Sequence, residues 1–521
     1  MGSATARADW DTLGTQQSLG AGITPGIATD SQGRIHLVYM TGGRIYYRLG
    51  TPAGVFGPTE EIPYPAGTGT YNSPHVIVDA NDVPHVAFEK DYLSTSKKAW
   101  YTNRIGGTWK SPVTAIDVTS EVGGRVNYPR LAVYGDYACV CALTSGSYSD
   151  GKIAMLNNLA SSPTVTHIRD TAYWTPYPVF TSQGYLYVTG RNGTSGHYIQ
   201  RYDLNLNPVG DEREISVGLP YKTGEPTAAA VDKNDVIHAA GISGEGEQRI
   251  IWYNNTQRLD QGKNCIHGLN VYDSGEKHYP TMTIDAAGTV YLSYYDGATG
   301  QGKASIVVGD SFATPVAFAP SMTGRLRWNP HMAPGLCGGV YAAWDDGGVS
   351  FLRSIGLVTG PPAKAGNPTP PDGATGLALI GTTLSWTTGV GTTSNNVYFG
   401  TTSPGTFRGN QVGTTYDPGA LDGNITYYWR IDGVNVYGTT PGDVWHFTTR
   451  SWPGDMDADN DVDQADFGAF QSCYSGHGVV YAAGCELADL DGDGYVDLGD
   501  FDLFQGCMSG DNLPADPTCA E

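Results

Sequence analysis

An internal repeat of about 50 residues constrains the fold more than any other feature of this chain. The repeat runs through residues 1–357, and in each copy a proline opens a β-strand. These prolines are Pro25, Pro74, Pro129, Pro178, Pro226, Pro280 and Pro330. Behind most of them an alternating apolar strand leads through an Asp/Asn/Gly turn to a second strand, as in residues 74–88. A unit of this length holds four short strands, so the sequence predicts a seven-bladed β-propeller over residues 1–357.

Polar and aromatic residues flank these prolines. Proline donates no backbone hydrogen bond, so it is expected at the start of a strand or on the innermost strand beside a central channel. The flanking residues should then surround one mouth of that channel. The candidates for catalysis are His75, Tyr128, Arg130 and His331. The candidates for substrate binding are Tyr177, Glu225, His278, Tyr279 and Arg327.

A packing or hydrogen-bonding role at the strand starts is the alternative for any one of these residues. Three further histidines, His36, His85 and His238, share one position in the second strand of three repeats. A repeated structural role explains that recurrence better than catalysis does.

The composition is typical of a turn-rich, aromatic-rich β protein, with 71 Gly, 33 Tyr and 11 Trp in 521 residues and only 16% charged residues. The formal net charge of −22 argues against a nucleic-acid partner, which requires clustered Lys and Arg. No apolar run approaches the ~20 residues of a membrane span. No signal peptide is visible, and Met1-Gly2-Ser3 looks like an expression remnant, so we expect a leader that has been removed.

Two acidic loops near the C-terminus, residues 455–466 and 489–500, match a calcium-loop template. Carboxylates at loop positions 1, 3, 5, 9 and 12 supply hard oxygen ligands, and position 7 offers a backbone carbonyl. Asn460 and Gly494 suit the sharp turn at position 6. The predicted ligands of two Ca²⁺ ions are Asp455, Asp457, Asp459, Asp461, Asp463 and Asp466, and Asp489, Asp491, Asp493, Tyr495, Asp497 and Asp500.

The sequence around the loops is duplicated, since 466–473 recurs as 500–507. Two calcium loops, each followed by one short helix, resemble a dockerin over residues 450–521. That resemblance implies a small α-helical module that binds Ca²⁺ and plugs a polysaccharide-degrading enzyme into a cohesin-like partner.

Four of the eight cysteines lie in this duplicated region as two equivalent pairs, which suggests disulfides 473–485 and 507–519. Such bonds imply an oxidising, extracellular setting, and the dockerin resemblance also favours a secreted protein. A cysteine metal site is the alternative, but no C-x-x-C spacing supports it. Cys139 and Cys141 point to one face of a strand and are expected to be buried apolar residues.

A linker at 358–366 precedes a region of alternating strands at 367–449. Its strand patterns at 384–386, 427–432 and 444–447 resemble those of a fibronectin type III domain. The resemblance implies a β-sandwich that acts as a spacer, and sugar binding by exposed aromatic residues is the alternative.

The repeat pattern at 72–79 and 84–88 resembles that of seven-bladed polysaccharide lyases, including ulvan lyases and rhamnose–glucuronate lyases. The resemblance implies β-elimination next to a uronic acid. A cation neutralises the carboxylate and lowers the pKa of the C5 proton, and His or Tyr transfers protons. The predicted substrate is therefore an anionic polysaccharide.

Two alternatives to the lyase remain open. A glycoside hydrolase with a sialidase-like propeller would need two carboxylates. Glu225 is the one acid directly at a strand-start proline, so Asp296, Asp345 or Asp346 would have to supply the second. The chain lacks the Asp boxes (Ser-x-Asp-x-Gly-x-x-Trp) of sialidases. The other alternative is a non-catalytic propeller that binds a glycan, although its site should then repeat from blade to blade.

Overall fold

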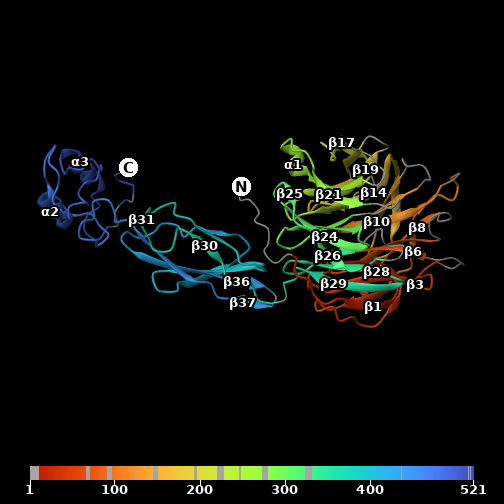
Figure 1. Ribbon diagram of the computed structural model, residues 1–521. Helices are drawn as coiled ribbons and strands as arrows, with labels where there is room; N and C mark the ends of the chain where they lie inside the picture. Colours follow the sequence, from red (N-terminus) through yellow and green to blue (C-terminus); the bar gives the residue numbers. More distant parts are fainter. Residues whose placement is uncertain are drawn as a thin grey trace. The chain divides into compact units, whose positions relative to one another are not determined.

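The protein is mainly β and divides into two units, residues 1–358 and 359–521 (Figure 1). The computed structural model describes residues 11–65, 71–90, 97–121, 124–144, 151–192, 196–219, 228–245, 248–272, 280–322, 331–358, 360–435, 437–513, 516 and 518–520. No helix within these ranges is both long and apolar enough to cross a membrane.

The described strands of the first unit form seven antiparallel sheets in chain order. Sheet 1 contains β2 (Ile23–Thr29), β3 (Ile35–Thr41), β4 (Arg44–Gly50) and β5 (Glu60–Glu61). Sheet 2 contains β6 (Tyr71–Val78), β7 (Pro84–Lys90), β8 (Lys98–Asn103) and β9 (Val113–Asp117). Sheet 3 contains β10 (Asn127–Tyr134), β11 (Tyr137–Leu143), β12 (Gly151–Asn157) and β13 (Thr164–Thr171). Sheet 4 contains β14 (Tyr173–Phe180), β15 (Leu186–Asn192), β16 (Gly196–Tyr202) and β17 (Pro208–Glu214).

The remaining sheets follow the same plan. Sheet 5 contains β18 (Ala228–Val231), β19 (Ile237–Glu245), β20 (Gln248–Asn255) and β21 (Ile266–Tyr272). Sheet 6 contains β22 (Thr281–Ile284), β23 (Val290–Asp296) and β24 (Gln301–Val308), with β25 (Ser311–Phe312) and β26 (Val316–Ala319) both paired to β24. Sheet 7 contains β27 (His331–Pro334), β28 (Val340–Asp346), β29 (Val349–Ile355) and β1 (Gln17–Ala21). Two short helices, η1 (Ile105–Gly107) and α1 (Thr256–Asp260), lie between strands.

The seven sheets form a closed series. The first strand of each sheet contacts the first strand of the next, from β2 through β6, β10, β14, β18 and β22 to β27, and β27 contacts β2. Sheet 7 joins the two ends of the unit, because β1 pairs antiparallel with β29, Gln17 opposite Leu352 and Ala21 opposite Val349. Closure of this kind covers sheet edges that would otherwise be open to unwanted pairing.

Apolar side chains fill the spaces between neighbouring sheets. Between sheets 3 and 4, Cys139 and Cys141 pack with Tyr173, Leu186 and Val188. Both cysteines are fully buried, as expected from the sequence, and their Sγ atoms lie 3.7 Å apart.

His36, His85 and His238 each connect an aspartate in a turn to a tyrosine on the third strand of the same sheet. Their Nδ1 atoms lie 3.0, 2.6 and 2.7 Å from the hydroxyls of Tyr47, Tyr101 and Tyr253. Their Nε2 atoms face the carboxylates of Asp30, Asp79 and Asp232. These networks confirm the repeated structural role predicted for the three histidines.

The second unit begins with two sheets. One contains β30 (Gly366–Thr369), β32 (Leu384–Thr387) and β35 (Thr415–Tyr416). The other contains β31 (Ala374–Leu377), β38 (Val444–Thr449), β36 (Thr426–Asn435), β33 (Ser394–Gly400), β34 (Thr406–Gln411) and β37 (Gly438–Thr440). They share one aromatic core, in which Trp386 of the first sheet packs with Trp429 and Phe399 of the second.

The C-terminal part of this unit contains α2 (Gln464–Cys473) and α3 (Leu498–Cys507), which pack through Phe470 and Phe504 with ring centroids 5.1 Å apart. The predicted disulfides Cys473–Cys485 and Cys507–Cys519 both form. Each repeat of the duplication braces the loop of the other. Ser475 Oγ accepts the Val496 amide at 3.0 Å, and Ser509 Oγ accepts the Val462 amide at 2.9 Å.

Candidate functional site

A cavity of about 350 Å³ lies among the first strands of all seven sheets of unit 1. Most of the residues that line it have apolar side chains, such as Val76, Leu131 and Met332. Four of the lining residues carry an imidazole, a guanidinium or a phenol: His75, Arg130, Tyr177 and His331. Four widely separated sequence candidates therefore meet in one cavity, as expected for a binding or catalytic site.

Hydrogen bonds fix the orientation of His75, which is 6% exposed. Its Nδ1 lies 3.3 Å from the Leu131 backbone nitrogen, which can only donate, so Nδ1 is the acceptor. In neutral His75 the proton is therefore on Nε2, which lies 3.5 Å from the Tyr177 hydroxyl oxygen. The two rings meet edge to face with centroids 6.0 Å apart.

Arg130 and His331 complete the polar part of the cavity. The His331 ring centroid lies 6.3 Å from that of His75, and the Arg130 Cζ lies 5.9 Å from the centre of the Tyr177 ring. Burial, with a smaller effect of the Arg130 charge, lowers the pKa of His331 to about 3 and the pKa of His75 well below its ordinary value. Both imidazoles are therefore neutral near pH 7, and Arg130 supplies a positive charge to the cavity.

A backbone irregularity repeated from sheet to sheet positions these side chains. In sheets 1, 2 and 3 the pairing register between the first two strands shifts at the proline. Regular pairing resumes at the residue that follows the proline, which is Gly26, His75 or Arg130. The residue before the proline has a positive φ in each case, 53° at Thr24, 49° at Ser73 and 53° at Tyr128. Such conformations are costly for non-glycine residues and cluster at functional sites.

The same shift in sheet 4 corrects the repeat predicted from the sequence. It falls between Trp174 and Tyr177, so Pro176 rather than Pro178 is the equivalent of Pro74. Tyr177 then occupies the same position as His75 and Arg130. The sequence contains both prolines, and only the strand register distinguishes them.

The other sequence candidates are distributed as follows. Tyr128 is adjacent to the cavity, but it is not among the residues that line it. Glu225, His278, Tyr279 and Arg327 lie outside the described residues.

Sequence reasoning missed Glu89, a fully buried carboxyl group on β7. Ser73 Oγ donates to its Oε1 at 2.8 Å, and the Tyr128 backbone amide also donates to this carboxyl. Burial raises the pKa of Glu89 to about 8, so it is largely protonated near pH 7. The signal in the sequence was an acid that ends the apolar stretch of residues 84–88.

The acids named for the hydrolase alternative differ in their surroundings. Asp296 Oδ2 accepts hydrogen bonds from Lys303 Nζ at 2.5 Å and Thr299 Oγ1 at 2.8 Å. Asp346 accepts a hydrogen bond from the Ser321 hydroxyl. Asp345 is 1% exposed, and neither carboxyl oxygen has a hydrogen-bond partner among the described residues. Burial and the nearby Asp346 charge raise the pKa of Asp345 to about 7.

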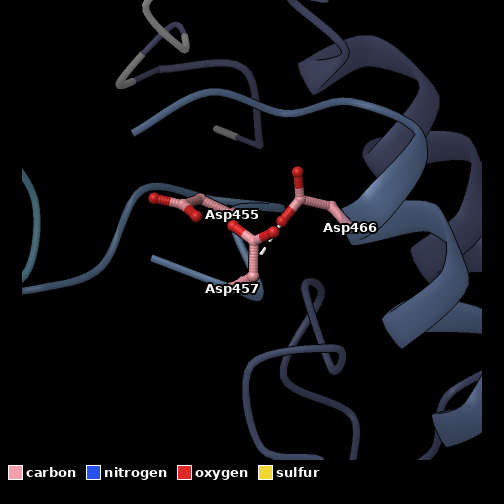
Figure 2. Close-up of side chains that lie close together, drawn as sticks. All are labelled: Asp455, Asp457 and Asp466. Atoms are coloured by element: carbon pink, nitrogen blue, oxygen red, sulfur yellow. Dashed lines mark hydrogen bonds between the residues drawn. The ribbon is translucent and has the colours of Figure 1, made fainter. Parts of the chain in front are cut away.

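The two acidic loops of the second unit bring carboxylates together as a metal site requires. Asp455, Asp457 and Asp466 form one cluster with ligand atoms within 4.8 Å of one another, and Figure 2 shows them gathered between the loop and α2. The second loop has the equivalent cluster of Asp489, Asp491 and Asp500.

The buried acid at position 12 organises each loop. Asp466 accepts the amides of Met456, Asp457 and Asp463 at 2.6, 3.2 and 2.8 Å. Asp500 bonds Leu490, Asp491 and Asp497 in the same way. The acids at position 9, Asp463 and Asp497, cap α2 and α3.

Two observations fit a cation in these loops. Asp461 Oδ1 and Asp489 Oδ1 are buried without a hydrogen-bond partner, as expected of atoms that coordinate a metal. In addition, Asp459 and Asp461 cluster with Asp466, and Asp461 and Asp463 cluster with Asp511. Asp511 was not predicted from the sequence because it lies outside the loop template. Asp493, Tyr495 and Asp497 belong to no such cluster of described residues.

No family model matches the chain, and no curated protein matches it. Similar solved structures include a polysaccharide lyase at 12% identity and TM-score 0.40, covering 66% of this chain and 100% of that chain. They also include an oligogalacturonate lyase from Vibrio parahaemolyticus at 8% identity and TM-score 0.40, covering 66% and 97%. A Hadza microbial sialidase has 10% identity and TM-score 0.36, covering 61% and 73%.

Proposed function

We propose that unit 1 is a seven-bladed β-propeller that cleaves a uronic-acid-containing polysaccharide by β-elimination in its central cavity. The observation that supports this most is the meeting of Arg130 with His75, Tyr177 and His331 in one cavity. A cation beside neutral bases and a phenol is the set of groups that β-elimination next to a carboxylate requires.

In this proposal Arg130 pairs with the uronate carboxylate and stabilises the negative charge that develops when C5 loses its proton. His331 is the base in this scheme, because its buried imidazole is unprotonated near pH 7 and has a free ring nitrogen lone pair for that proton. The C5–H electrons form the C4=C5 double bond as the C4–O4 bond breaks. Tyr177 donates its hydroxyl proton to the leaving O4, and His75 orients that hydroxyl through Nε2.

The test is incubation of the full chain with a panel of uronic-acid and neutral polysaccharides, with ultraviolet absorbance and reducing ends followed in parallel. We expect both signals to rise with a uronate polymer, because β-elimination leaves an unsaturated product. Reducing ends without absorbance would mean hydrolysis. Neither signal with any polymer would contradict an enzymatic role and favour a glycan-binding propeller.

Two variants locate the chemistry. Arg130→Ala and His331→Ala are each expected to lower kcat/KM about 100-fold or more, since each removes a group that acts in the transition state. His167→Ala, which removes an exposed histidine on β13, is the control and should keep full activity. Retained activity in both cavity variants would place the reaction elsewhere.

A glycoside hydrolase is the second candidate, and the buried acid Asp345 favours it. Its pKa, raised to about 7, suits a general acid. Release of reducing ends without a rise in ultraviolet absorbance in the same assay would support the hydrolase.

We propose that the second unit attaches the catalytic unit to a partner protein outside the cell. Residues 367–449 would be a fibronectin type III-like spacer after the linker at 358–366. Residues 450–521 would be a dockerin-like module that binds two Ca²⁺ ions and a cohesin-like protein. The two disulfides support secretion, because such bonds persist in oxidising compartments. Capture of a cohesin by the full chain only when calcium is present would support the module's role.

A further inference from the structure

Two strained residues in neighbouring sheets share one hydrogen-bonding partner, Glu89. Ser73 in sheet 2 and Tyr128 in sheet 3 both have positive φ values, and both precede a proline. The residue after each proline, His75 or Arg130, lines the cavity. Glu89 accepts a hydrogen bond from the Ser73 hydroxyl and another from the Tyr128 amide. One carboxyl group therefore connects the two segments that carry His75 and Arg130.

The position of Glu89 in its strand makes this connection specific to sheets 2 and 3. Glu89 lies opposite Asn72 in the register of sheet 2, and the equivalent positions hold Met40 in sheet 1 and Leu143 in sheet 3. In sheet 1 the strained residue is Thr24, whose buried hydroxyl has no hydrogen-bond partner in the residues that the structure describes. The strained conformation thus recurs in sheet 1, where a methionine replaces the carboxyl group.

A buried carboxyl group is costly unless it is neutral or its oxygens are hydrogen-bonded. Glu89 is fully buried, and within the described part of the chain its Oε2 has no hydrogen-bond partner. Packing alone would be served as well by an apolar residue, as it is at Met40 and Leu143. The two hydrogen bonds that Glu89 accepts explain why a carboxyl group, and not an apolar side chain, occupies this position.

We propose that Glu89 is a positioning residue that fixes the spacing of His75 and Arg130 by bracing Ser73 and Tyr128. Its effect on turnover rests on the proposed function, whereas its effect on the geometry of the cavity does not. Glu89 does not itself contact the substrate. Because small displacements of reacting groups lower rates strongly, loss of the brace should impair the reaction more than the fold.

Glu89→Ala and Glu89→Gln in the full chain test this role. The amide oxygen of glutamine can accept the bonds from Ser73 and Tyr128, so we expect Glu89→Gln to retain kcat/KM within about threefold of the parent. Alanine accepts neither bond, and kcat/KM should fall about 10- to 100-fold. Met40→Ala, a truncation at the equivalent position of sheet 1, is the matched control and should leave kcat/KM unchanged.

Crystal structures of the same variants test the brace without reference to turnover. In Glu89→Ala, Ser73 or Tyr128 should leave the positive-φ region and His75 or Arg130 should shift, whereas Glu89→Gln and Met40→Ala should keep the parent geometry. If Glu89→Ala fails to fold, the variant Ser73→Ala takes its place in both measurements. Ser73→Ala removes one of the two hydrogen bonds, so we expect a smaller shift, at His75.

Three results would overturn the proposal. One is an unchanged cavity in Glu89→Ala, or in Ser73→Ala where that variant replaces it. The second is an inactive Glu89→Gln with an unchanged cavity, which would make Glu89 a proton donor instead. The third is a cavity shift in Met40→Ala as large as that in Glu89→Ala. A parent protein without turnover would contradict the proposed function alone, since the crystal structures still decide whether Glu89 braces the cavity.

Discussion

At the scale of single residues, burial keeps several histidines of unit 1 uncharged. His36, His75, His238 and His331 all have lowered pKa values with burial as the largest cause, so they are neutral near pH 7. The raised pKa values of Glu89 and Asp345 have the same main cause, and Glu89 is consequently largely neutral near pH 7. In the described lining of the cavity Arg130 consequently places its positive charge beside two neutral imidazoles, which strengthens its interaction with an anion.

Asp345 yields a prediction about stability and pH. Its pKa is about 7 in the folded protein and 3.8 ordinarily, so the folded state binds an extra proton between these values. The contribution of Asp345 to stability is therefore complete below pH 3.8 and is lost as the pH rises through about 7. Relative to the parent, Asp345→Asn should gain up to about 4 kcal/mol in unfolding free energy between pH 4 and pH 8.

Urea unfolding at a series of pH values measures this difference, with the exposed Asp11→Asn as control. The histidines act in the opposite direction, because stability from neutral imidazoles is lost as the pH falls below 6.5. Comparison of the variant with the parent cancels their effect. A difference that stays constant with pH would show that Asp345 is ionised in the folded protein.

At the scale of elements, the period of the repeat was visible in the sequence, but the register within each repeat was not. Alternating apolar residues and Asp turns mark two strands per repeat, and both disulfide pairs follow from the duplication. The choice between Pro176 and Pro178 depends on a register shift, which arises from pairing with the second strand. Glu89 was missed for a similar reason, because its partner Tyr128 comes from another sheet.

The acidic loops give a prediction at this scale. Asp466 accepts three backbone amides and contributes to two carboxylate clusters, so Asp466→Ala should abolish calcium binding by the first loop. Titration calorimetry of the full chain should then show one site where the parent shows two. The control Asp502→Ala changes an exposed acid on α3 and should keep both sites.

Removal of calcium from the parent should destabilise the C-terminal module more than either substitution does. Without a cation the clustered carboxylates repel one another, so EDTA should lower the Tm of the C-terminal module by several degrees. An unchanged Tm with EDTA, together with no heat on calcium addition, would contradict the calcium assignment.

At the scale of the whole molecule, the first unit depends on a strand from its own N-terminal end. β1 supplies the outer strand of sheet 7, whose other strands come from residues 331–355. Deletion of residues 1–21 should expose the edge of β29 and lower the unfolding free energy of unit 1 by about 2–4 kcal/mol, mainly through lost ladder hydrogen bonds.

Calorimetric scans of the full chain measure this effect, because unit 2 has its own core and should keep its transition. Deletion of residues 1–10 alone retains β1 and is the matched control. Equal transition temperatures for the two truncated chains would show that β1 adds nothing to the stability of the ring.

The crossed bracing in the C-terminal module has a consequence for how that module is made. Ser475 and Ser509 each complete the loop of the opposite repeat, so neither half has all of its hydrogen bonds alone. During synthesis the first loop must wait for residues 509–512, which close over Val462 and Asp461. The first loop therefore gains these hydrogen bonds only after residues 509–512 have left the ribosome, and a product that stops before residue 509 would lack them.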